Sequence, residues 1–77
     1  MKGQFAMAGE ITFTDEVNNI WEEQGRVCVT FCLHAAVYKL AVGSADFDRH
    51  LASLKASLDT GKGVTVVVRQ TDIVGVS

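Results

Sequence analysis

Large apolar side chains recur at every second position over much of this chain, and that alternation restricts the folds open to it. The clearest stretch runs from Arg26 to His34, where the alternate apolar residues are Val27, Val29, Phe31 and Leu33. A period of two indicates a β-strand with one face buried and the other exposed. The same period recurs in four further segments: residues 5–14, 36–42, 64–70 and 73–76.

One segment has a helical period instead. Four apolar residues are spaced i, i+4, i+7 and i+11, which places them on one side of an α-helix: Phe47, Leu51, Leu54 and Leu58. Asp46 is a suitable N-cap residue, and Gly61 suits the left-handed position that ends a helix. We expect this side of the helix to pack against apolar residues of the strands: Phe31, Leu33, Tyr38, Leu40 and Val66.

The segment from Asp15 to Gly25 is open to two interpretations. Asn18-Asn19 suits a tight hairpin turn, because asparagine tolerates a positive φ, and strands would then continue through Val17 and Ile20. Alternatively, the whole segment is a loop that carries Trp21. We favour the extended hairpin, with an irregularity at Gln24-Gly25.

The predicted element order is β-β-β-α-β-β, in a mostly β (α+β) chain that forms a single domain over residues 1–77. A three-stranded meander, a helix and a final hairpin resemble the layout of an OB-fold, in which a five-stranded barrel is plugged by a helix. A curved antiparallel sheet with one packed helix would give the same order. No residue motif supports a particular family within either architecture.

Charge and hydropathy exclude several classes of protein. The formal net charge is −2, and the seven lysines and arginines are scattered, which disfavours a nucleic-acid partner. No apolar run reaches the roughly 18 residues of a membrane span, so no membrane partner is expected. The first residues lack the apolar core of a secretory signal, and a cytoplasmic location is predicted.

Three residues that could bind zinc, Cys28, Cys32 and His34, share one face of the clearest strand. At the rise of an extended chain the two cysteines lie about 13 Å apart, too far for a common ion or a disulfide. His50 follows Asp46 by one helical turn, but the sequence offers no third group to complete a catalytic set. We therefore predict no metal, no cofactor and no enzymatic activity.

The faces of the predicted strands that point outward carry small, uncharged residues where a solvated sheet normally carries lysine, glutamate and arginine. Such a face suits contact with another copy of the chain, so a homo-oligomer is predicted, with an interface at Cys28, Cys32, Val37 and Val67. The predicted function is a small non-enzymatic binding or protein-interaction module that self-associates. The alternative is an OB-type domain for single-stranded nucleic acid, whose contact residues would be Trp21, Arg26, Tyr38, Lys39 and Arg69.

Overall fold

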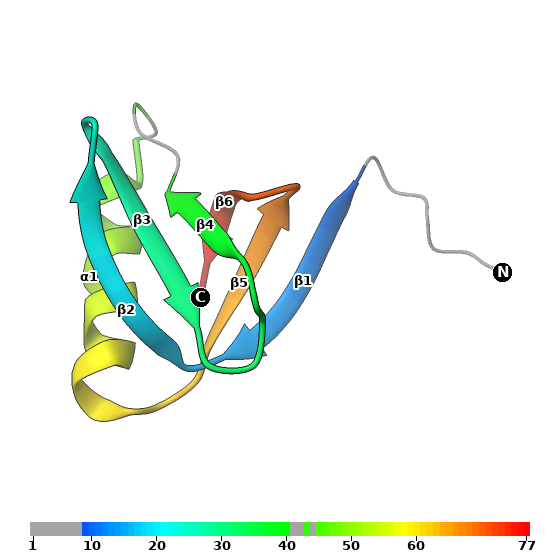
Figure 1. Cartoon of the computed structure of the whole chain (residues 1–77), viewed down its shortest axis with the longest axis vertical. Helices are drawn as coiled ribbons and strands as arrows, with labels where there is room; N and C mark the ends of the chain where they lie inside the picture. The colour runs from blue at the N-terminus through cyan, green and yellow to red at the C-terminus, as the bar shows by residue number, and fades with distance from the viewer. Residues whose placement is uncertain (1–8, 41–42, 44) are drawn as a thin grey trace, which may run out of the picture.

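The computed structural model describes residues 9–40, 43 and 45–77, which form one sheet and one helix (Figure 1). The elements, in chain order, are β1 (Glu10–Asp15), β2 (Val17–Glu23), β3 (Arg26–Phe31), β4 (Val37–Leu40), α1 (Phe47–Thr60), β5 (Val64–Arg69) and β6 (Asp72–Val76). The first half of the predicted strand over residues 5–14, and the end of the predicted strand over 36–42, lie outside the described residues.

The six strands lie side by side in the order β1-β5-β6-β4-β3-β2, so β1 and β2 are the two ends of the sheet. One residue, Glu16, separates β1 from β2 along the chain, and the two strands act as halves of one sharply bent strand (Figure 1). Counted as one strand, they restore the predicted order β-β-β-α-β-β. The mostly β, OB-like fold is therefore confirmed, as a curved sheet that β1 and β2 do not close into a barrel.

The sheet is antiparallel except where β4 and β6 run parallel, with Lys39 beside Asp72 and Leu40 beside Ile73. The curved-sheet alternative was predicted to be antiparallel, and the β4–β6 pair departs from that prediction. The parallel pair arises because α1 carries the chain from β4 across to β5, and β6 then returns along β4.

The segment from Asp15 to Gly25 is extended and not a loop, but the hairpin predicted within it is wrong: the segment is one strand, β2, and the turn that joins it to β3. The turn lies at Gln24-Gly25, where φ is 54° and 76°. Two successive positive φ angles characterise the two-residue turn that matches the twist of a hairpin. Asn18-Asn19 instead lies within β2, next to a shift in register between Val17 and Asn19.

The core is made by the inward-facing residues of the strands together with one helical leucine. Its fully buried side chains are Leu40, Leu54, Ile73, Val29, Val66 and Val68. Tyr38 and Phe47 pack against this cluster from partly buried positions. The alternation read from the sequence therefore identified the inward faces of β3 and β5 correctly.

The buried side of α1 differs from the predicted one. Its buried residues are His50, Leu54 and Ser57, whereas Leu58 is 38% exposed. Ser57 accepts a bond from the Val17 amide at 3.1 Å and donates its hydroxyl proton to the Lys62 carbonyl, so a small polar residue fits where the helix meets β2. A buried serine is favourable here because its hydroxyl is fully hydrogen-bonded.

Two further predictions about the helix are corrected. Leu33 lies beyond the end of β3 and is 83% exposed, so it does not contact α1 as expected. Asp46 occupies the N-cap position, but its side chain makes no capping bond and pairs with Arg49 at 2.9 Å. Gly61 ends the helix in the left-handed conformation, with φ of 75°, as predicted.

Candidate functional site

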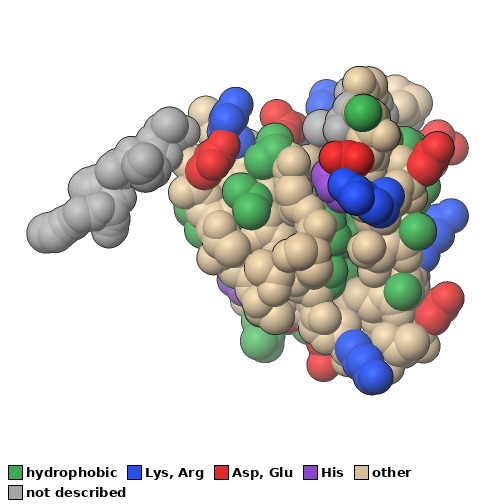
Figure 2. Space-filling view, turned by 180° about the vertical axis from the view of Figure 1, so that it is seen from behind, with side chains coloured by type: hydrophobic (Ala, Val, Ile, Leu, Met, Phe, Trp, Pro, Cys, Tyr) green, Lys and Arg blue, Asp and Glu red, His purple; other side chains and the backbone are tan. Residues whose placement is uncertain are grey.

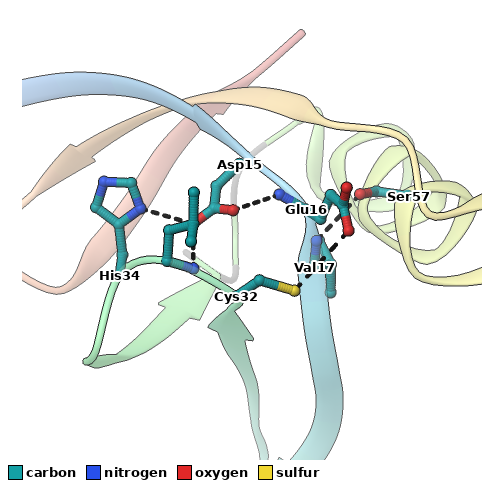
Figure 3. Close-up of polar contacts among 7 residues, drawn as sticks. Asp15, Glu16, Val17, Cys32, His34 and Ser57 are labelled. Carbon is teal, nitrogen blue, oxygen red and sulfur yellow. Dashed lines mark hydrogen bonds and ion pairs between the residues drawn. The ribbon is translucent and has the colours of Figure 1, made fainter.

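The bend between β1 and β2 is built around the buried carboxylate of Asp15. One oxygen, Oδ1, accepts a bond from the Glu16 amide at 2.7 Å. The other, Oδ2, accepts a bond from the Leu33 amide at 2.8 Å and lies 2.7 Å from Nδ1 of His34. Figure 3 shows the carboxylate between the strand that carries it and the loop that follows β3. Asp15 therefore fastens that loop to the bend.

Two opposing effects set the pKa of Asp15. Burial disfavours the charged form and acts to raise the pKa. The hydrogen bonds from His34, Leu33 and Glu16 favour the charged form, and together they outweigh burial. The pKa of Asp15 is therefore lowered from its ordinary value of 3.8.

The imidazole of His34 is held from two sides. Its ring stacks on Phe13 with the ring centres 3.8 Å apart, while Nδ1 meets Asp15. The Cys32 amide adds a third tie between loop and bend by donating to the Glu16 carbonyl at 3.0 Å. Together these contacts fix both the position and the orientation of the loop.

A pocket of about 390 Å³ lies beside this network, and it is lined by Thr14, Asp15, Glu16, Cys32, Leu33 and Gly63. The Cys32 sulfur is 4.0 Å from a carboxylate oxygen of Glu16. Desolvation, and then the charges of Glu16 and Asp15, raise the pKa of the Cys32 thiol. A thiol that stays protonated is a poor nucleophile and a poor metal ligand.

An aspartate that orients a histidine is one part of a nucleophilic catalytic set, and the other part is a hydroxyl or thiol beside the second ring nitrogen. Within the described part of the chain, no such group is recorded against Nε2 of His34, and Cys32 contacts Glu16 instead. Nor do three or more metal-binding side chains gather anywhere in residues 9–40, 43 and 45–77. The arrangement is suited to holding a loop.

Sequence reasoning missed the Asp15–His34 pair and considered His50 with Asp46. His50 is buried in α1, and its backbone amide bonds to the Asp46 carbonyl as part of the helix. A signal for Asp15 was present, because it shares the parity of Ile11 and Phe13 and so continues an inward face with a charged residue. The partner 19 residues away has no sequence signature.

Three of the five residues predicted to contact a ligand lie in one row across the outer side of the sheet. The row is set by the strand register and has one residue from each strand, in sheet order: Glu10, Arg69, Asp72, Lys39, Cys28 and Trp21. We call this the charged row. Arg26 joins it through an ion pair with Asp72. Tyr38 does not, because its ring packs inside the sheet against Phe31 and Phe13.

The positive charges of the charged row are largely matched by negative ones. Arg26 lies 3.8 Å from Asp72, and Arg69 pairs with Glu10. The Trp21 ring nitrogen donates to Glu23 at 3.4 Å, which adds another acidic group beside the row. A surface with this balance of charge lacks the basic footprint that drives binding to nucleic acid.

The residues predicted to form an oligomer interface do not form one exposed surface. Cys28 is only 2% exposed within the single chain, between Trp21 and Lys39 on the neighbouring strands, so its place in the interface is corrected. Cys32 is exposed in the loop after β3, and Val37 is 42% exposed at the start of β4. Val67 lies on the other side of the charged row from Val37.

Around Val67 the outer side of the sheet is small and uncharged. The residues there come from β1, β5 and β6, and we call them the threonine–valine face: Thr12, Thr14, Thr65, Val67 and Gly75. The hydroxyls of Thr14 and Thr65 bond to each other at 2.8 Å. Figure 2, which views the molecule from behind, shows charged side chains gathered along the upper margin of its left half.

A second pocket, of about 270 Å³, opens between α1 and the β2–β3 hairpin. Its walls are Ile20, Trp21, Val27 and Leu51, and Glu22 and Lys55 complete the lining. Sequence analysis singled out Trp21 here but not its neighbours, because β2 was not established as a strand and its register against the helix was unknown.

Comparisons with known proteins identify the fold but no family. No protein-family model matches the sequence, and no curated protein does either. A solved structure with the same fold is the cholera toxin-like B-subunit from Citrobacter freundii, with a TM-score of 0.69 and 16% sequence identity. The match covers 92% of this chain and 85% of that one. At this identity, the likeness establishes the shared fold alone.

Among the described residues, none of the helical structure is both long and apolar enough to span a bilayer.

Proposed function

We propose that this protein is a small non-enzymatic binding module that self-associates through the threonine–valine face. The observation that carries the proposal is the contrast across the outer side of the sheet. On one side of the charged row lie short, uncharged side chains on three adjacent strands, among them Thr12 and Val67. Such a surface packs closely against another flat surface with little loss of side-chain entropy.

Two further observations support self-association. A chain of 77 residues has a thin core, so burial of additional apolar surface between copies contributes a large share of its stability. The protein from Citrobacter freundii that shares this fold is described as a subunit, that is, one component of an assembly. The cytoplasmic location stays a prediction, which cell fractionation would test.

The interface is tested by placing a charge on it. Val67→Arg should shift the assembly to monomer in sedimentation equilibrium, because an unpaired charge buried between copies costs several kcal/mol. The matched control is Val37→Arg, another valine on a strand of the same sheet but across the charged row, and it should leave the mass unchanged.

Thr12→Arg is a second variant on the same face, and because Thr12 is an exposed residue of an end strand, it should fold normally. A wild-type chain that remains monomeric at high micromolar concentration would contradict the proposal. So would an assembly that Val37→Arg dissociates and Val67→Arg does not.

A further inference from the structure

β2 is an open edge of the sheet. In the described structure it pairs with β3 on one side, and it is the last strand in the sheet order. The Val17 amide is taken by Ser57 and the Ile20 amide by the side chain of Asn19, so the stretch toward Glu22 is the part of this edge that offers backbone groups to another extended chain. Proteins that bind peptides by strand addition use an edge of this kind, with pockets that receive alternate side chains.

The second pocket lies directly beside this edge. Ile20 and Trp21 line it from β2 itself, and Val27 and Leu51 complete an apolar wall. Its volume of about 270 Å³ is just below the usual range for small-molecule sites, which suits one inserted side chain better than a whole small molecule. A strand edge for backbone pairing and a pocket for one side chain therefore lie next to each other.

The charge of the edge indicates the chemistry of its partner. Three glutamates lie along β2 or next to it, Glu16, Glu22 and Glu23, and the strand contains no lysine or arginine. Within the described ranges, none of the three has a recorded ion pair, in contrast to Glu10, which pairs with Arg69. Lys55, on the rim of the pocket, is the positive group on the helix side.

We infer that the open edge of β2 binds an extended, basic peptide segment and takes one of its apolar side chains into the pocket beside Trp21. The backbone of the segment pairs with β2, its apolar side chains face the side of the pocket and Glu22, and its lysines or arginines face the side of Glu23. This site is independent of the proposed self-association, which uses the opposite end of the sheet.

A second copy of this chain is a poor occupant of the same edge. Two β2 edges would bring together strands that carry exposed glutamates and no basic residue, and β1 offers no basic residue either, since its Glu10 is already paired with Arg69. Like charges facing one another across a strand pair are destabilising. The negative charges of β2 are complementary to a partner rich in lysine or arginine.

The experiment uses three synthetic seven-residue peptides with alternating sequence. The first alternates lysine with valine or leucine, the second has glutamate for each lysine, and the third is the lysine peptide N-methylated at alternate amides, which blocks strand pairing. Trp21 is the one tryptophan of the chain, so its emission reports on the pocket directly. Amide chemical shifts in NMR spectra show which strand is contacted.

The lysine peptide should shift the Trp21 emission to shorter wavelength and move the amide signals of β2, while those of β1 stay in place. Glu23→Lys should weaken its binding by about tenfold, because the substitution turns an attraction into a repulsion. Asp59→Lys makes the same change of charge at an exposed position near the end of α1 and should leave the binding unchanged.

Several results would overturn the inference. Equal affinity for the lysine and glutamate peptides would show that charge does not contribute to binding. Unchanged affinity for the N-methylated peptide would show that the peptide does not pair with β2 through its backbone. A lysine peptide that moves neither the emission nor the β2 signals would show that the edge does not bind such segments. Trp21 emission that changes with protein concentration alone would show that a second copy occupies the pocket.

Discussion

The two halves of the bent strand carry acidic residues in opposite circumstances. In β1 the carboxylate of Asp15 is buried and receives bonds from two amides and a histidine, and Glu10 pairs with Arg69. In β2, Glu22 and Glu23 are exposed and have no recorded ion pair among the described residues. Both strands are edges of the same sheet, so edge position alone does not decide how a charge is used.

Burial explains the bonding of Asp15, whereas the exposed Glu10 is paired because the strand register places Arg69 opposite it. A carboxylate taken out of water must find replacement bonds within the protein, and an unsatisfied one would cost several kcal/mol. Exposed carboxylates keep their hydration and require no partner. Asp15 is therefore committed to the fold, whereas Glu22 and Glu23 remain available to a charged partner.

The strongest test of this contrast is the loss of the buried carboxylate. Asp15→Asn keeps the shape of the side chain but places an amide nitrogen where backbone amides already donate. We expect a loss of about 3 kcal/mol in the free energy of unfolding, measured by urea denaturation, because charge-assisted bonds contribute more than neutral ones. A loss below about 0.5 kcal/mol would show that the network at the bend does not form in solution.

The contribution of Asp15 should also depend on pH. Its pKa in the folded protein is below the ordinary value of 3.8, so folding favours the charged form. The stability it contributes is present above the unfolded pKa and is lost as pH falls through the folded pKa. The difference in stability between wild type and Asp15→Asn should therefore shrink between pH 5 and pH 2, and a constant difference would contradict this explanation.

Removing the histidine should have a smaller effect. His34→Ala deletes one of three bonds to Asp15 and the stacking on Phe13, but leaves both backbone amides in place. We expect a loss of about 1–2 kcal/mol in thermal or urea unfolding. His34→Phe should recover part of it, since the stacked ring is retained. A loss equal to that of Asp15→Asn would mean that the amides contribute nothing.

The exposed glutamates of β2 should matter least to stability. Replacement of both, in Glu22→Gln with Glu23→Gln, should change the free energy of unfolding by no more than about 0.5 kcal/mol, because exposed charges stabilise little and glutamine can still accept the long bond from the Trp21 ring nitrogen. A loss of 2 kcal/mol or more in urea denaturation would show that these carboxylates are committed to the fold as Asp15 is.

The arrangement of elements could be predicted further from sequence than the details of their packing. Alternation identified the inward faces of β3 and β5 because each strand has one buried side. It could not give the buried side of α1, because Ser57 is buried through bonds to Val17 and Lys62 and not through hydropathy. Gln24-Gly25 was predicted only as an irregularity and the turn was placed at Asn18-Asn19, since glutamine seldom adopts a positive φ and asparagine does so more readily.

The candidate site was less predictable because it depends on contacts between distant segments. Trp21, Lys39 and Arg69 were proposed together and do share the charged row, but their acidic neighbours come from other strands. Cys28 has the outward parity expected of it, yet it is buried between Trp21 and Lys39. Parity predicts which way a side chain points, and only the register shows what covers it.

A titration of the Asp15 carboxyl carbon, followed by NMR in the folded protein, tests this account most directly. Burial and hydrogen bonding act on this group in opposite directions, so the sign of the change shows which one dominates. If the bonds from His34, Leu33 and Glu16 hold the bend as described, the midpoint will lie below 3.8. A midpoint above that value would show a buried carboxylate without those bonds, and would contradict the distinction drawn between the two halves of the strand.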